Sequence, residues 1–185
     1  MLVAPPSVVV ETSAPRRALT IREQRRLALT GELGWNGIAG FGAVLSYHAS
    51  PHFSVDLGAG IALVGPKIGV RGRFNLLKTS VTPFIGVGFM AAAGWDSPID
   101  ITDPKAEDKV NVKISPSWFS QGVVGLDWTS RGGFTLVSAL GYAWLLSGDN
   151  VQIVTGEPNA DERQAIDISF RDSAVVSIAL GYSLK

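Results

Sequence analysis

The sequence predicts an all-β protein, an eight-stranded antiparallel up-and-down β-barrel that spans a membrane. Three observations predict this class: apolar residues alternate with polar or small ones, aromatic residues gather at strand ends, and long loops alternate with short turns. Hydrophobic residues make up 46% and charged residues 17% of the 185-residue chain. No run reaches the roughly 20 consecutive apolar residues of a membrane helix. The apolar character is spread over alternating strands instead.

The clearest strand covers residues 67–77. Successive side chains of a strand point to opposite faces, so one face here is apolar and the other is cationic. The apolar face carries Ile68, Val70, Phe74 and Leu76, and the opposite face carries Lys67, Arg71 and Arg73. In a soluble sheet the cations would face water. In a membrane barrel the aliphatic face would contact lipid and the cations would point into the lumen.

The same alternation predicts eight strands in chain order. They cover residues 26–35, 39–48, 53–63, 67–77, 81–93, 118–128, 134–146 and a final segment that ends at Leu184. Turn signals separate them, at Asn36-Gly37, Ser50-Pro51, Gly65-Pro66 and 130–133. Two long loops, about 94–117 and 147–165, fall at the barrel end opposite the termini. This asymmetry is typical of outer-membrane barrels.

The two long loops carry patterns of their own. Apolar residues alternate within 110–114 and recur in 151–154, which predicts partly ordered hairpins that project beyond the bilayer and offer a strand edge to a partner. The first loop is acidic and contains Asp96, Asp100, Asp103, Glu107 and Asp108. Their spacing does not match a calcium-binding loop, so we expect solvated charges, with divalent-ion bridging to lipopolysaccharide as the alternative.

The aromatic residues that face outward fall into two groups. Those expected near the short turns are Tyr47, Phe53, Phe74, Trp128, Phe134 and Tyr182, and those near the other end are Trp35, Phe89, Trp118 and Trp144. Two such girdles on either side of an aliphatic belt match the two interfaces of a bilayer. A soluble lipocalin-like barrel, the alternative fold, gives no reason to sort aromatic residues by height.

The inward face carries the charged residues Glu32, Asp56, Lys67, Arg71, Arg73 and Asp127. Side chains fill the lumen of an eight-stranded barrel, and enclosed charges must be paired. A two-residue turn at Gly65-Pro66 would place Asp56 opposite Asn75 and diagonal to Arg73, and Gly58 opposite Arg73. Glu32 is then expected to meet Arg71 across the lumen.

Residues 1–25 are predicted to form a flexible basic lead-in to a barrel domain of residues 26–185. Thr20 and Glu23 have the spacing of a capping box, which predicts one short helical turn. Five arginines between Arg16 and Arg26 are expected to be solvated, with contact to anionic lipid head groups as the alternative. Residues 1–6 are too short for the apolar core of a signal peptide, so export would require a leader that precedes this sequence.

The sequence offers little that resembles catalytic chemistry. Its two histidines, His48 and His52, are expected at the barrel rim and in a turn, with Ser54 and Asp56 nearby only in sequence. A positioned nucleophile and base are missing, so we expect no enzyme; a lipid-modifying membrane enzyme is the alternative. We expect no cofactor and no metal site. The net charge of zero gives no reason to expect a nucleic-acid partner.

Strand number, alternation, girdles and the C-terminal segment 181–184 resemble the small eight-stranded outer-membrane barrels, the family of the outer-membrane protein A transmembrane domain, over about residues 26–185. The sequence departs from the family at Leu184-Lys185, where an aromatic residue is usual. The resemblance implies a porin-like fold in the outer membrane of a Gram-negative cell envelope. It also implies a monomer in contact with membrane lipid that serves as a structural anchor, or binds protein or lipopolysaccharide through its long loops. A small-solute channel is a further alternative, which the narrow lumen disfavours.

Overall fold

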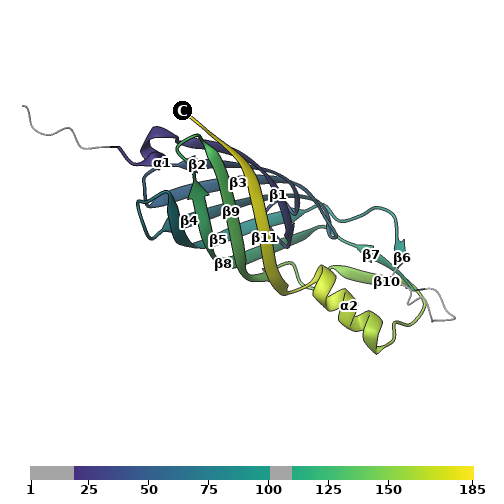
Figure 1. Ribbon diagram of the computed structural model, residues 1–185. Helices are drawn as coiled ribbons and strands as arrows, with labels where there is room; N and C mark the ends of the chain where they lie inside the picture. The colour runs from purple at the N-terminus through teal and green to yellow at the C-terminus, as the bar shows by residue number, and fades with distance from the viewer. Residues whose placement is uncertain (1–18, 101–109) are drawn as a thin grey trace, which may run out of the picture.

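The computed structural model describes residues 19–100 and 110–185 and contains a closed antiparallel barrel of eight strands (Figure 1). The barrel strands are β1 Leu27–Trp35, β2 Phe41–His48, β3 Phe53–Ala62, β4 Gly65–Asn75, β5 Val81–Ala92, β8 Ser117–Thr129, β9 Phe134–Leu145 and β11 Ser173–Leu184. Their order around the barrel is β1-β11-β9-β8-β5-β4-β3-β2. The predicted fold class is confirmed, and the predicted strands differ from the observed ones only at their ends.

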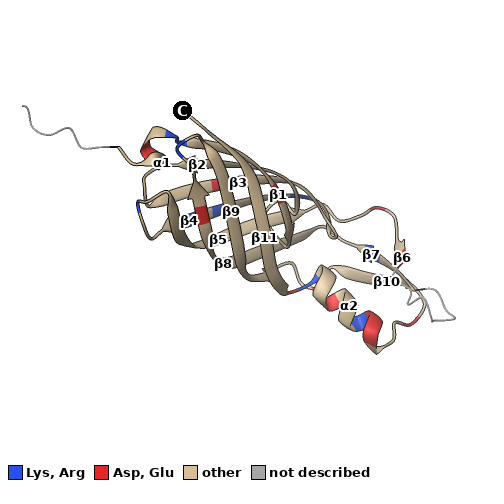
Figure 2. Cartoon of the chain, viewed as in Figure 1, with Lys and Arg blue, Asp and Glu red and all other residues tan. Residues whose placement is uncertain are grey.

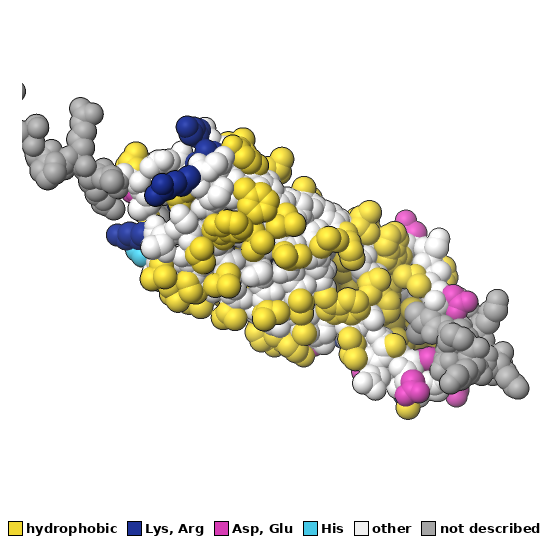
Figure 3. All heavy atoms as spheres, viewed as in Figure 1, with side chains coloured by type: hydrophobic (Ala, Val, Ile, Leu, Met, Phe, Trp, Pro, Cys, Tyr) yellow, Lys and Arg dark blue, Asp and Glu magenta, His cyan; other side chains and the backbone are white. Residues whose placement is uncertain are grey.

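The outer wall of the barrel is apolar. Along each strand exposed residues alternate with buried ones, and the exposed ones are mostly aliphatic or aromatic, as on β5, where Val87 is 69% exposed. Hydrophobic side chains spread over the barrel wall, while basic side chains gather at the end where β1 begins and β11 ends, and acidic ones at the opposite end (Figure 3). Soluble monomers rarely expose so much contiguous apolar surface. This inside-out arrangement identifies a lipid-facing wall and thus a transmembrane barrel.

The ten aromatic residues assigned to girdles all lie on the exposed side of the wall. At the end with the short turns, Phe53 pairs with Phe74, and Phe134 pairs with Tyr182. The Trp128 ring packs edge-on against the Phe134 ring, with 5.5 Å between their centroids.

The turn between β3 and β4 differs from the prediction. It consists of Leu63 and Val64, whereas Gly65 and Pro66 already pair within the sheet. Gly65 has φ +103 and lies so close to the Gly94 carbonyl that an added Cβ would be 2.2 Å from that oxygen, so only glycine fits. The register therefore shifts.

Asp56 is paired with Arg71 and not with Asn75, and Gly58 is paired with Gly69 and not with Arg73. The prediction was wrong because a proline near the start of a strand resembles a turn signal in the sequence. The inward and outward faces are unchanged, since the shift is an even number of residues.

A short helix lies at the end of the barrel that carries the C-terminus (Figure 1). This helix, α1 Ile21–Gln24, is held by the predicted capping box, in which Glu23 N donates to Thr20 Oγ1 at 3.4 Å and Thr20 N donates to Glu23 Oε2 at 2.8 Å. The helix precedes the expected domain boundary at residue 25, yet Arg22 and Arg25 reach into the barrel end. The described part of the lead-in thus packs onto the barrel.

The two long loops fold together into a small subdomain at the opposite end (Figure 1). It contains β6 Ile99–Asp100, β7 Asn111–Ile114, β10 Val151–Thr155 and the helix α2 Ala160–Phe170, and we call these four elements the loop subdomain. Its sheet has the order β10-β7-β6. The first loop pairs partly with itself, as predicted, but the second contributes a single strand that pairs across to the first.

The loop subdomain has its own buried apolar side chains. They come from β7 and the residue before it, from β10 and from α2, and include Val110, Val112, Ile114, Val151, Ile166 and Phe170. These side chains belong to one cluster with apolar residues at the mouth of the barrel, such as Val64 and Ala92. Among the residues that the structure describes, no helix is both long and apolar enough to cross a membrane.

Candidate functional site

A network of buried ion pairs lies inside the barrel, toward the end that carries α1. Arg73 on β4 contacts Asp56 on β3, with 2.8 Å between Nε and Oδ2 and 2.8 Å between Nη2 and Oδ1. The same guanidinium donates through Nη1 to Asp127 Oδ2 on β8 at 2.9 Å. All three side chains are inaccessible to solvent. One cation thus joins two carboxylates from different strands inside the lumen. On the ribbon, charged positions are few along the barrel strands and are more frequent on α1 and near α2 (Figure 2).

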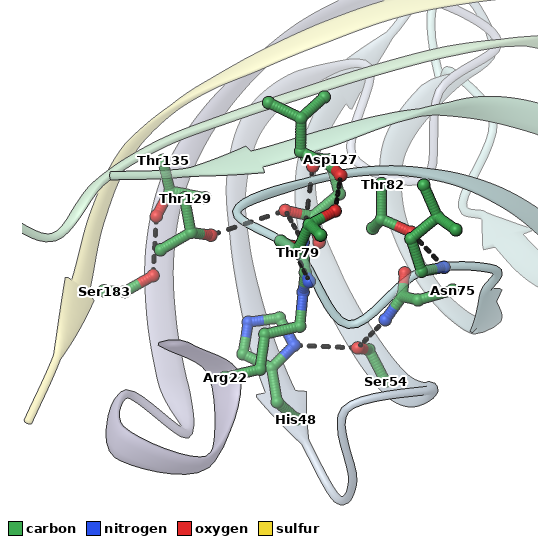
Figure 4. A network of polar contacts seen from close by, with 12 residues as sticks. Arg22, His48, Ser54, Asn75, Thr79, Thr82, Asp127, Thr129, Thr135 and Ser183 are labelled. Carbon is green, nitrogen blue, oxygen red and sulfur yellow. Dashed lines mark hydrogen bonds and ion pairs between the residues drawn. The ribbon is translucent and has the colours of Figure 1, made fainter. Parts of the chain in front are cut away.

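Two further arginines extend this network. Arg71 lies opposite Asp56 in the register and donates through Nε to its Oδ2 at 2.9 Å. Arg22 reaches in from α1, with its Nη2 3.2 Å from Asp127 Oδ1 and its Nη1 2.8 Å from the Thr79 carbonyl oxygen (Figure 4). Arg22 therefore closes the barrel end that the short turns surround.

Arg25, the residue directly after α1, makes a second contact with the barrel. Its Nη1 donates to the Ser183 carbonyl at 2.7 Å, and its guanidinium lies 5.6 Å from the centroid of the Tyr182 ring. The expectation of solvated arginines is wrong for Arg22 and Arg25, because both are buried, while Arg26 is exposed. The signal in the sequence was their three-residue spacing on a capped turn, which places both side chains on one helix face. Arg16 and Arg17 lie outside the described residues.

A histidine and a serine meet next to this network. The Nδ1 atom of His48 lies 2.7 Å from Ser54 Oγ, and Asn75 Nδ2 donates to the same hydroxyl at 2.9 Å (Figure 4). All three side chains are buried in the lumen. His52 lies apart, in the turn, where its ring stacks on Phe74 with centroids 5.8 Å apart.

This pair does not have the surroundings of a catalytic dyad for lipid. Ser54 is 0% exposed and points away from the lipid-facing wall, so an acyl substrate in the bilayer does not reach it. Asp56, the nearby acid, is bound by Arg71 and Arg73 and does not orient the His48 ring. The arrangement packs polar groups inside a closed barrel.

The interior near the loop subdomain is filled by an inward turn. Ile38 and Ala39, between β1 and β2, are both 0% exposed. Ala39 N donates to Glu32 Oε2 at 2.7 Å, which fixes the turn inside the lumen. Glycine is required at the facing position of β3, because a Cβ on Gly58 would lie 2.8 Å from Ile38 Cγ1.

Glu32 was expected to meet Arg71, and that pairing was wrong. Its carboxylate accepts the Ala39 amide instead, and it interacts electrostatically with the buried Lys67 on β4. The Lys67 ammonium also lies 5.9 Å from the centroid of the Phe119 ring. The six predicted interior charges are all buried, but they form two groups at different heights in place of one network.

The loop subdomain is tied to the barrel rim by a buried amide. Asn150 Nδ2 donates to Ser117 Oγ at 3.0 Å and to the Phe170 carbonyl oxygen at 2.8 Å, which joins the start of β8 to the end of α2. On the outside, Arg171 pairs with Asp149 at 2.9 Å and with Asp167 at 2.8 Å. These contacts hold the end of α2 close to the rim.

The acidic residues of the first loop show no ligand geometry in the described part. Asp96 and Asp100 are exposed, and Asp103, Glu107 and Asp108 lie outside the described residues. Within residues 19–100 and 110–185, no group of three or more His, Cys, Asp or Glu side chains is arranged to hold a metal ion.

Comparisons with known proteins add little to this geometry. No protein-family model matches the sequence, and no curated protein matches it significantly. Among solved structures, the chain is similar to the crystal structure of Acinetobacter baumannii CarO, with a TM-score of 0.43 and 11% sequence identity over 85% of this chain and 97% of that chain. A similarity this distant transfers no function, so the functional argument depends on the closed barrel and its loop subdomain.

Proposed function

We propose that this eight-stranded transmembrane barrel is a non-enzymatic protein of the bacterial outer membrane that anchors the loop subdomain at the cell surface. The observation that carries the proposal is the filled lumen, which Arg73 spans between Asp56 and Asp127. Arg22 closes one end and Ile38 fills the interior toward the other. Because the interior of the barrel is filled by side chains that stabilise it, the outer loops are the part of the protein available for interaction.

The filled lumen supports an anchor over a small-solute channel. Eight strands leave an interior just wide enough for side chains to fill. A conducting path would have to break the contact of Arg73 with either carboxylate, and leaving a buried charge unpaired is strongly unfavourable.

The loop subdomain supports a role in interaction. It buries its own apolar side chains, and Asn150 fixes it to the barrel rim, so partners would meet a defined surface. We expect this surface to contact protein or lipopolysaccharide, and we expect the barrel to act as a monomer with its wall in membrane lipid.

The first test is conductance. Folded protein, verified by heat-modifiable migration on a gel, is added to planar lipid bilayers beside an open porin as the control. We expect no stepwise current from the parent, because the ion pairs and the inward turn occupy the lumen. Stable current steps whose frequency rises with protein concentration would contradict the closed interior and favour the channel.

The second test is surface labelling. The chain contains no cysteine, so single cysteines give clean signals. Gln152→Cys on β10 is expected to react with a membrane-impermeant maleimide in intact cells. Arg131→Cys, an exposed turn residue at the opposite end, is expected to react only after lysis. The reverse pattern would invert the orientation and would remove the loop subdomain from the cell surface.

A further inference from the structure

An apolar groove runs between the barrel wall and the loop subdomain. It has a volume of about 510 Å³, within the range of about 300–1,000 Å³ that small-molecule sites occupy. Its lining comes from β2, β3, the turn after β3, β6 with the segment before it, and the end of α2: Phe41, Ile61, Ala62, Leu63, Trp95, Ser97, Pro98, Ile99 and Phe170. Eight of these nine side chains are apolar, and none is charged.

One side of the groove is the lipid-facing wall itself. Phe41 and Ile61 are paired across β2 and β3 and are 62% and 55% exposed, and Leu63 continues the same face. An alkyl chain could therefore pass from the bilayer into the groove without crossing water. A second cavity of about 170 Å³ shares Phe41 and Leu63 and reaches the girdle residue Trp35.

The other side of the groove is held in place by hydrogen bonds. Trp95 Nε1 donates to the Leu63 carbonyl at 2.7 Å, and Trp95 N donates to the Ile114 carbonyl at 3.0 Å. Ile99 pairs with Val112 in the sheet of the loop subdomain. Phe170 is buried in the apolar cluster. The groove is thus preformed by fixed elements, which lowers the entropy cost of filling it.

We propose that this groove binds an acyl chain of a membrane lipid from the leaflet beside the loop subdomain. The inference depends on the proposed membrane insertion, because the lipid surface supplies the occupant. Every methylene group that leaves water for the groove favours binding, and the lining has no charge to orient a polar ligand or to pair with an ionic one. Continuity with the lipid-facing wall favours a lipid chain over a water-soluble peptide or a second copy of the protein.

Trp95 provides the reporter for a direct test. The other four tryptophans, Trp35, Trp118, Trp128 and Trp144, are replaced by phenylalanine, and the protein is inserted into phosphatidylcholine vesicles with brominated acyl chains. We expect strong quenching of Trp95 fluorescence, because bromine on a chain in the groove lies next to the ring. If the four-fold variant does not fold, quenching is compared between the parent and Trp95→Phe. The part of the quenching that is lost with Trp95 then reports the same contact.

A matched pair of variants separates groove binding from mere closeness to the bilayer. Ser97→Asp places a charge in the groove and is expected to abolish the quenching of Trp95, because burying an unpaired carboxylate opposes entry of the chain. Gln152→Glu adds the same charge on the exposed side of β10, away from the groove, and should leave the quenching intact. Equal quenching in both variants would overturn the groove.

A second reporter separates this inference from the proposed function. A variant that keeps only Trp118, which lies on the lipid-facing wall, must be quenched if the barrel spans the bilayer. Failure at Trp118 would overturn the membrane barrel. Quenching at Trp118 without quenching at Trp95 would overturn the acyl-chain site alone. Protection of Trp95 that rises with protein concentration would identify a second copy as the occupant and would also overturn it.

Discussion

Replacing Arg73 by alanine is expected to lower the free energy of unfolding by about 3–5 kcal/mol, the cost of breaking a buried ion pair by removing one partner. The change removes one side chain but affects two carboxylates, because Arg73 contacts both Asp56 and Asp127. Asp56 would keep Arg71 and Asp127 would keep Arg22, so the barrel should still fold. Urea titration in detergent, followed by tryptophan fluorescence, measures the difference.

Two further variants give this experiment its controls. Arg131→Ala changes an exposed arginine in a turn and is expected to alter stability by no more than about 0.5 kcal/mol. Combining Arg73→Ala with Asp127→Asn should cost less than the sum of the two single changes, because the residues share one interaction. An Arg73→Ala protein that unfolds like the parent would show that the interior network does not stabilise the barrel.

Replacing Phe170 by alanine is expected to destabilise the loop subdomain by about 3–5 kcal/mol, the usual cost of removing a buried phenylalanine ring. Phe170 is 6% exposed and packs in the apolar cluster at the end of α2. The barrel strands should not respond, because their pairing does not involve this side chain. The measurement is limited trypsin digestion of the folded protein, with cleavage expected at Arg163 and Arg171.

Ile168→Ala is the matched control on the same helix. Ile168 is 48% exposed, so its truncation creates no cavity and should leave the resistance to trypsin unchanged. Heat-modifiable migration of the undigested barrel would show that the damage is local. Loss of that migration in Phe170→Ala would instead show that the barrel and the loop subdomain unfold as one unit.

The barrel could be predicted from the sequence because lipid-facing and lumen-facing residues alternate along each strand and differ in polarity. On β4 the alternation of Ile68 and Val70 with Arg71 and Arg73 determines which face is outside, whatever the register. The register itself depended on one turn. Gly65 and Pro66 have the composition of a turn but form the start of a strand, so the partner of Asp56 was misassigned.

Other features could not be predicted because their evidence lies in contacts between distant segments. The pairing of β10 with β7 joins two loops that are separate in the sequence, and local alternation does not identify a partner strand. The helix α2 did leave a signal, the capping box of Asn159 and Glu162, but its hydrophobic periodicity is weak. The inward turn at Ile38 left none, since an Asn-Gly pair predicts a tight turn and not its direction.

The inward turn also constrains the order in which the barrel can assemble. Ile38 occupies a space that β3 and β4 surround, and β1 is the strand that closes the barrel against β11. We therefore expect the β1–β2 hairpin to form with its tip bent inward before β1 pairs with β11. Contacts between neighbouring strands are local and form early, so this sequence of events follows the faster route. Once the barrel has closed around the hairpin tip, we expect unfolding to require release of Ile38, which would slow unfolding and add kinetic stability.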